Sequence, residues 1–254
     1  MENTIELKTI NHPAWFKQWF DSVFYHQLYA NRSEKEASDL IDGLLEVLTP
    51  APNASILDLG CGAGRHAKYL ASKAFNVTGL DLSSSSIRMA KKSERPNLHF
   101  ATHDMREPFG KNCFDYVFNF FTSFGYFKND EENRQVIRNI YHSLKPGGLL
   151  VLDYLNVDFA EQHLVAEEAK EIDGIVYHIS RWTDEKFFYK KIMIGNMDGI
   201  QSEFIEQVAK FDLNDFGYLF ERDGLQLEKV YGDYCLNEYD SKSSPRMILM
   251  GKKV

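Results

Sequence analysis

The chain has 254 residues, 44% hydrophobic and 26% charged, which is enough to bury a sizeable core in one domain. Its formal net charge of −8 argues against broad nucleic-acid binding, because contacts to phosphates need basic surface. No apolar run approaches the roughly 18 residues of a membrane span, and the opening MENTIELKTINHPAW lacks the apolar stretch of a secretory signal. Cys61, Cys113 and Cys235 are far apart without CxxC spacing, so we expect no metal site and reduced thiols in a cytoplasmic protein.

The first half of the chain alternates between two periodicities. Residues 33–48 have apolar positions at helical spacing, and Ser33 with Glu36 matches a capping box at their start. Short apolar runs then predict strands at 55–60, 76–82, 97–104, 114–121 and, after a KPGG turn, 149–155. Helical patterns lie between them at 64–74, 86–93 and 131–144. Strands that alternate with helices predict a doubly wound, mostly parallel α/β sheet covered on both faces.

The pattern changes after Tyr154. Residues 175–182, 187–194 and 203–211 read as consecutive antiparallel strands separated by turns. A helix at 213–224 and two strands at 225–234 and 246–253 then complete a seven-stranded body. We therefore expect one domain over 1–254, with residues 155–211 as a small antiparallel β insertion that covers the substrate pocket as a lid.

Three glycines separate the first predicted strand from its helix in DLGCGAGRH. Gly60, Gly62 and Gly64 let the backbone approach a ligand closely, and the following helix offers free backbone N–H groups. A nicotinamide fold would place its third glycine where Arg65 stands, and the GKS or GKT of a P-loop is absent. The turn therefore predicts a ligand site at the carboxyl ends of the strands, but not a pyrophosphate site.

Acids follow or end three successive predicted strands beside this turn. Asp81 is placed to accept hydrogen bonds from both hydroxyls of a ribose. Asp104 is placed to accept from an exocyclic amine such as that of adenine. Asp58 either holds the glycine turn or meets an ammonium group through water.

Five segments occur in an order that is typical of one family: DLGCGAGRH, GLDLS, HDM, FDYVFNFFTSFGYF and LKPGGLLVLD. Over roughly residues 30–155 the chain resembles the class I S-adenosylmethionine-dependent methyltransferases. It is most similar to the small-molecule branch that includes glycine and aminosugar N-methyltransferases. GRH, SFGYF and the late VYGDY and SPRMIL are similar to uncharacterised members of that branch. The resemblance implies a Rossmann-like methyltransferase fold and S-adenosyl-L-methionine as the cofactor.

The resemblance also implies roles for individual residues. The methionine part of the cofactor would be lined by the backbone of Gly60, Cys61, Gly62 and Gly64. Asp81 would hold the ribose, Leu82 would pack on the adenine, and Asp104 and Met105 would contact its edge and face. Asn119 and Phe120 would lie near the reactive methyl group. Residues 1–32 would form a helical cap over the cofactor, with Tyr25, Tyr29 and Arg32 as its contacts.

The function implied is methyl transfer to a small-molecule acceptor, an amine or a hydroxyl. Two alternatives stay open: a cofactor-binding regulatory or structural module without turnover, and an RNA or protein methyltransferase. Enzymes that methylate base amino groups usually carry Asn or Asp followed by Pro-Pro and an aromatic residue, whereas Asn119 precedes Phe-Phe-Thr, which argues against nucleic acid. Among His66, His103 and His178 no catalytic base is chosen, and the chain is either a monomer or a homodimer.

Overall fold

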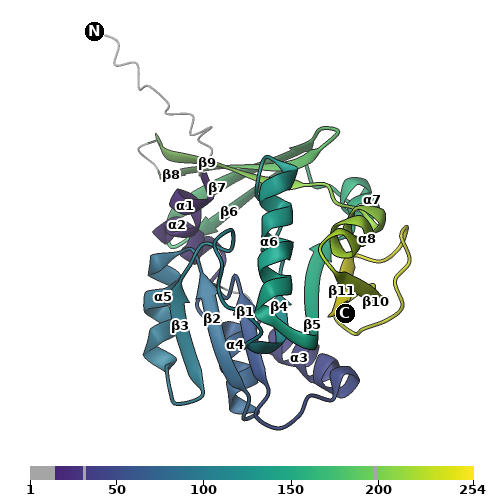
Figure 1. Ribbon diagram of the computed structural model, residues 1–254. Helices are drawn as coiled ribbons and strands as arrows, with labels where there is room; N and C mark the ends of the chain where they lie inside the picture. Colours follow the sequence, from purple (N-terminus) through teal and green to yellow (C-terminus); the bar gives the residue numbers. More distant parts are fainter. Residues whose placement is uncertain (1–14, 31–32, 197–198) are drawn as a thin grey trace.

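A computed structural model describes residues 15–30, 33–196 and 199–254. It contains a seven-stranded sheet in the order β10-β11-β5-β4-β1-β2-β3 (Figure 1). These strands are β1 (Ser55–Leu59), β2 (Asn76–Asp81), β3 (Leu98–Thr102), β4 (Phe114–Asn119), β5 (Leu144–Leu155), β10 (Leu225–Tyr231) and β11 (Arg246–Lys253). The first five pair in parallel, and β11 runs antiparallel between β5 and β10. The predicted doubly wound, mostly parallel sheet is confirmed.

Helices cover both faces of this sheet. They are α3 (Glu34–Leu48), α4 (Arg65–Ser72), α5 (Ser84–Ala90), a 3-10 turn (Lys91–Ser93), α6 (Asp130–Ser143) and α8 (Leu213–Arg222). Leu57 and Leu59 of β1 belong to the core that includes α6 and α8, whereas the alternate residue Ile56 belongs to the core that includes α3, α4 and α5. A strand that is buried on both faces is mostly apolar, which is why SILDL shows no alternation; its one buried acid, Asp58, is hydrogen-bonded.

Local signals account for where several elements begin. Ser33 is the N-cap of α3, and its Oγ accepts a hydrogen bond from the Glu36 amide at 3.1 Å. The predicted KPGG turn is instead part of β5, which begins at Leu144. The register shift in the β4–β5 pairing lies between the Phe114–Leu144 and Tyr116–Leu149 pairs, so the turn chemistry produces an irregularity within the strand.

A second, four-stranded antiparallel sheet follows α7 (Val157–Gln162). It contains β6 (Glu167–Ile172), β7 (Ile175–Thr183), β8 (Phe187–Asn196) and β9 (Gly199–Ala209). The three predicted strands are present, but β6 was not predicted. Its sequence EEAKEI is polar and mostly exposed, and it pairs only with β7 at the sheet edge. An edge strand of this kind buries no apolar face that could have revealed it.

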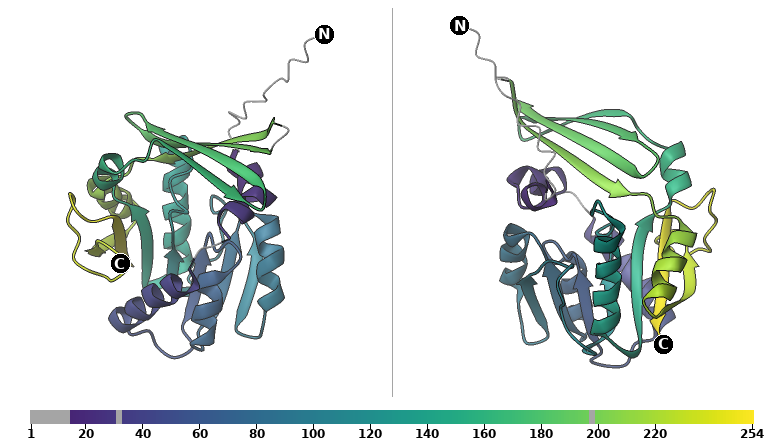
Figure 2. Two further views of the ribbon diagram at one scale, coloured as in Figure 1. Left: turned by 180° about the vertical axis from the view of Figure 1, so that it is seen from behind. Right: turned by 45° about the horizontal axis from the view of Figure 1, so that its top comes forward.

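Two short helices, α1 (Trp15–Phe20) and α2 (Val23–Leu28), lie between the second sheet and the body (Figures 1 and 2). Trp19 on α1 is completely buried, and its ring packs against Phe204 of β9 with centroids 4.7 Å apart. We call residues 15–30 the cap. Throughout the described part of the chain, no helix has the length and apolar character needed to cross a membrane.

Candidate active site

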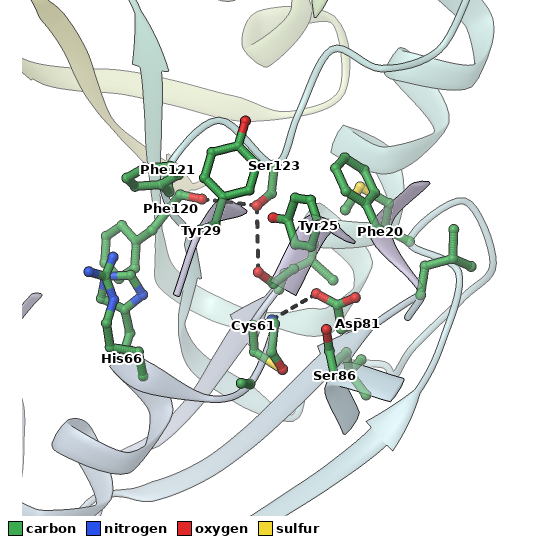
Figure 3. A pocket seen from close by; sticks show the side chains of 18 of the residues that line it. Phe20, Tyr25, Tyr29, Cys61, His66, Asp81, Ser86, Phe120, Phe121 and Ser123 are labelled. Carbon is green, nitrogen blue, oxygen red and sulfur yellow. Dashed lines mark hydrogen bonds between the residues drawn. The ribbon is translucent and has the colours of Figure 1, made fainter. Parts of the chain in front are cut away.

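A cavity of about 410 Å³ opens where the glycine turn, the carboxyl ends of the central strands and the cap meet (Figure 3). Its size falls in the range of about 300–1,000 Å³ that is usual for small-molecule sites. Three acids lie on its wall: Asp81 and Asp104, which were predicted, and Glu34 at the start of α3. Many of its other lining residues are aromatic: Phe16, Phe20, Tyr25, Tyr29, Phe120, Phe121, Tyr126 and Phe127. The cavity therefore combines carboxylates with extensive aromatic surface.

The three glycines of the turn all have positive φ, but they meet different surroundings. A Cβ on Gly62 would have no heavy atom within 4 Å, so its backbone faces open space on the cavity wall. A Cβ on Gly60 would lie 2.6 Å from the Cβ of Ser123, and one on Gly64 would lie 2.6 Å from the ring of Phe100. Gly64 is not among the described residues that line the cavity. It faces Phe100 and lets the start of α4 pack close to β3.

Asp81 connects the end of β2 to the glycine turn. Its Oδ2 accepts from the Gly62 amide at 2.7 Å, and its Oδ1 accepts from the Ser83 amide at 2.8 Å. Burial raises the pKa of this carboxyl above its ordinary value, against the effect of these two bonds. Asp81 thus fixes the turn while lining the cavity (Figure 3).

Asp104 lines the cavity but is already paired with Arg106. Arg106 donates from its amide and Nε to Oδ1, and from Nη2 to Oδ2 at 2.7 Å. These bonds outweigh burial and lower the pKa of the Asp104 carboxyl. Arg106 also donates to Glu132 at 2.6 Å, so the acid is held from α6. Arg106 was not among the predicted site residues, although it directly follows the HDM segment.

Asp58 is buried away from the cavity. Its Oδ2 accepts from the Ala67 amide in the first turn of α4 at 3.0 Å, and burial raises its pKa to about 7. Of the two roles considered for this residue, the structure supports the one that holds the chain around the turn.

Replacing Asp58 with asparagine is expected to change how stability depends on pH. The pKa in the folded protein is about 7 against an ordinary value of 3.8, so the folded state binds this proton more tightly. The stabilisation is complete below the ordinary pKa and is lost as the pH rises through the folded pKa. An amide keeps the acceptor for Ala67 without titrating. The melting temperature of the wild type minus that of the variant should therefore fall from about pH 4 to about pH 8.

Asp115 provides a control of the opposite sign. It accepts from the Ser55 amide at 2.8 Å, and its pKa is lowered by Lys145 and that amide although burial opposes them. The melting temperature of the wild type minus that of Asp115→Asn should therefore increase as the pH rises. If the difference in melting temperature between the wild type and Asp58→Asn does not change with pH, the raised pKa of Asp58 is contradicted.

The other predicted site residues divide by position. Several line the cavity: Tyr25, Tyr29, Gly60, Cys61, Leu82, Met105 and Phe120. Asn119 is buried behind the wall, where its Nδ2 donates to the Leu59 carbonyl at 2.7 Å. Arg32 lies outside the described residues. Burial raises the pKa of the Cys61 thiol, which disfavours a reactive thiolate.

The cap is fastened to the body through α5. Asp21 accepts from the Ser85 amide at 2.6 Å and from the Ser83 hydroxyl at 3.0 Å. His26 Nε2 lies 2.8 Å from the Ser85 hydroxyl. These contacts place the cap over the end of β2, beside Asp81.

The second sheet holds the other side of the cap. Glu206 of β9 accepts from Trp19 Nε1 at 2.6 Å and from the Tyr29 hydroxyl at 3.2 Å. Lys190 of β8 donates to the same hydroxyl and lies 3.7 Å from Glu206. Among the described residues that line the cavity none comes from β6–β9, so the sheet reaches the site through the cap. That residues 155–211 act as a lid with substrate contacts of their own stays a prediction.

Truncating Glu206 to alanine is expected to loosen the cap. The change removes the carboxylate that Trp19, Tyr29 and the half-buried Lys190 share, at a cost of about 1–3 kcal/mol. Hydrogen exchange of the cap amides should accelerate, as measured by mass spectrometry. Glu203→Ala is the matched control, because Glu203 pairs with Lys191 at 2.8 Å and alternation along β9 places it on the opposite face. Equal acceleration in both variants would contradict this support of the cap.

Comparisons with known proteins identify the family. A family model described as a methyltransferase domain matches residues 56–148. The Bacillus subtilis (strain 168) protein YqeM, assigned as a methyltransferase, is 30% identical over 212 residues, which cover 78% of this chain and 83% of that protein. The dTDP-3-amino-3,4,6-trideoxy-alpha-D-glucopyranose N,N-dimethyltransferase of Streptomyces venezuelae is 32% identical over 132 residues, 51% of this chain and 54% of that enzyme. Glycine N-methyltransferase of Oryctolagus cuniculus is 30% identical over 151 residues, 52% of this chain and 51% of that enzyme.

Some alignments span still less of a relative, such as 41% of a methyltransferase relative from Geobacillus sp. (strain WCH70). Among solved structures, the S-adenosylmethionine-bound amino pentose methyltransferase CalS10 from Micromonospora echinaspora has a TM-score of 0.67 at 21% identity, covering 91% of this chain and 97% of that one. That likeness supports the fold, and the match to YqeM over most of its length supports the family. The chain belongs to the class I S-adenosylmethionine-dependent methyltransferases, and S-adenosylmethionine is its cofactor.

Proposed function

We propose that this enzyme transfers a methyl group to an amine or hydroxyl of a small-molecule acceptor. The observation that carries the proposal is a single cavity that combines an open glycine turn, a strand-end carboxylate and an aromatic wall. Relatives that are named for an aminosugar and for glycine support an acceptor of this size.

The residues of the cavity fit the cofactor. Each Asp81 oxygen accepts one backbone N–H, which leaves a lone pair on each for the two ribose hydroxyls. Among the described residues, Asp104 Oδ2 accepts from Arg106 Nη2 alone, which leaves a lone pair for the adenine amine. The open space above Gly62 allows close approach of the methionine part. Leu82, Met105, Tyr25 and Tyr29 would complete the enclosure from the strand ends and the cap.

When bound, S-adenosylmethionine supplies a methyl group that its sulfonium already activates. The protein's part is to align an acceptor atom with that methyl and to exclude water. Phe120, Phe121 and Tyr126 offer aromatic faces, which tolerate positive charge better than cationic side chains would. His66 and His103 line the cavity and His178 does not. An amine acceptor requires only the loss of its proton before attack, so we assign no catalytic base.

Two measurements test the proposal. Calorimetry should give micromolar binding of S-adenosylhomocysteine, about −8 kcal/mol, and far weaker binding of NAD or ATP. A panel of amino acids, aminosugars, hydroxy acids, tRNA and unfolded protein should then be incubated with S-adenosylmethionine. We expect acceptor-dependent formation of S-adenosylhomocysteine with a small amine or hydroxyl compound. Transfer only to tRNA or protein, or binding without turnover on the whole panel, would reject the proposal.

A further inference from the structure

Two consecutive residues of the cavity wall have an unusual backbone conformation. Phe121 has φ of 73° and Thr122 has φ of 67°, in the left-handed region that aromatic and β-branched residues rarely adopt. Both come after Phe120, the residue that follows the end of β4, and both line the cavity, where Figure 3 shows Phe121 beside Phe120. Strained residues persist where surrounding contacts fix them, and they cluster at ligand sites.

The contacts that fix this pair come from distant parts of the chain. Asp153 of β5 accepts from the Phe121 amide through Oδ2 at 2.8 Å, and its carbonyl accepts from the Thr122 amide at 3.4 Å. Arg246 of β11 donates from Nη2 to the Thr122 hydroxyl at 3.0 Å. The Tyr126 hydroxyl donates to the Thr122 carbonyl. The amide, carbonyl and hydroxyl of Thr122 are thus each held by another residue.

Asp153 is the centre of this arrangement and is completely buried. Its Oδ1 accepts from Arg246 Nε at 2.8 Å, and its Oδ2 accepts from the Tyr234 hydroxyl at 3.0 Å. Burial, and then the Asp153 charge, raise the pKa of Tyr234, so this hydroxyl stays a donor. Tyr234 lies in VYGDY and Arg246 in SPRMIL, the two late segments noted in the sequence. Neither segment contributes a residue to the described lining of the cavity.

The position of the network argues for more than packing. A buried ion pair loses so much solvation that apolar residues of the same volume would serve stability as well or better. The described lining residues include neither Asp153, Arg246 nor Tyr234. Asp153 and Arg246 reach the cavity wall through their hydrogen bonds to Phe121 and Thr122. The adjoining Ser123 hydroxyl donates to the Phe120 carbonyl at 3.0 Å and lies 3.5 Å from the Gly60 carbonyl, so this wall continues into the glycine turn.

We propose that Asp153, Arg246 and Tyr234 are positioning residues for methyl transfer. They hold Phe121 and Thr122 in the left-handed conformation and so set the wall against which the acceptor is aligned. The inference rests on the proposed function, in which Phe120, Phe121 and Tyr126 form the wall beside the transferred methyl group. Cofactor binding, by contrast, depends on Asp81 and the glycine turn.

The test uses Asp153→Asn, Arg246→Lys and the nearly isosteric Thr122→Val, which removes only the hydroxyl that Arg246 holds. Arg134→Lys is the matched control, because Arg134 forms a similar ion pair with the buried Asp223 at 3.0 Å between α6 and α8. Each full-length variant is crystallised with S-adenosylhomocysteine, and its affinity for this compound is measured by calorimetry. Initial rates with the acceptor from the panel give kcat and KM.

In Asp153→Asn and Arg246→Lys, Phe121 or Thr122 should leave the left-handed region. We expect kcat/KM for the acceptor to fall by about tenfold to a hundredfold, while affinity for S-adenosylhomocysteine changes by less than about threefold. The double variant Thr122→Val with Arg246→Lys should lose no more kcat/KM than the worse of the two single variants. Both substitutions remove the same hydrogen bond between Arg246 and the Thr122 hydroxyl. Arg134→Lys should keep the wild-type kcat and KM.

Several results would overturn the inference. It fails if Phe121 and Thr122 both keep the left-handed conformation in Asp153→Asn and Arg246→Lys. It also fails if these variants keep the wild-type kcat and KM for the acceptor, or if Arg134→Lys loses as much kcat/KM as they do. Should Asp153→Asn not fold, Thr122→Val and Tyr234→Phe make the same comparison with smaller changes. If the wild type binds S-adenosylhomocysteine but methylates nothing on the panel, the proposed function fails. The crystal structures then still show whether Asp153, Arg246 and Tyr234 hold residues 121–122 in the left-handed conformation.

Discussion

Replacing Asp81 with alanine is expected to weaken binding of S-adenosylhomocysteine by at least about tenfold. Hydrogen bonds to a charged group are worth about 1.5–3 kcal/mol each, and about 1.4 kcal/mol corresponds to a factor of ten. The variant would lose the acceptor that we propose for both ribose hydroxyls, and it releases the Gly62 amide, which Asp81 holds at 2.7 Å. Calorimetry measures the affinity, and thermal unfolding shows whether the fold survives.

Asp115→Ala separates this effect from a general loss of structure. Asp115 also accepts a backbone amide, that of Ser55 at 2.8 Å, but it lies near the start of β4, opposite the carboxyl ends that form the cavity. Its truncation should lower the melting temperature and leave the affinity at the wild-type level. Unchanged affinity and unchanged melting temperature in Asp81→Ala would mean that the ribose is held elsewhere.

A leucine at Gly62 is expected to reduce the affinity for S-adenosylhomocysteine by about a hundredfold or more. A Cβ at this position meets no atom of the described residues within 4 Å, so a larger side chain would project into the space that we propose for the methionine part. The residue also has φ of 54°, where a side chain costs about 1–2 kcal/mol in stability. Calorimetry and chemical denaturation measure the two effects separately.

Gly147→Leu is the matched control for the backbone strain. Gly147 has φ of 76°, a Cβ there also meets nothing within 4 Å, and the residue is exposed at the start of β5. Both leucine variants should lose similar stability, but only Gly62→Leu should lose affinity. Full affinity in Gly62→Leu would show that the cofactor does not approach this part of the turn.

The acids show where prediction from the sequence stops. All three lie at or just beside strand ends. Asp81 lines the cavity while it accepts two backbone amides, Asp104 is paired with Arg106, and Asp58 accepts an amide in the first turn of α4. The end of a strand can be predicted from the sequence, because it is marked by an apolar run and a following breaker that lie within a few residues of each other. Which donors surround a carboxylate depends on neighbouring elements, and the sequence does not show these.

The sequence by itself determined the alternating helices and strands, the glycine turn and the family, because each depends on residues close together in the chain. Apolar runs specify strands that are buried on both faces, and glycines permit the positive φ of the turn. Only the tertiary structure decided that the cap lies between the second sheet and the cavity, through Glu206 and Trp19. It alone brought Arg246 to Thr122, 124 positions away. Such contacts are set by how packed elements align in space, and no local pattern encodes that alignment.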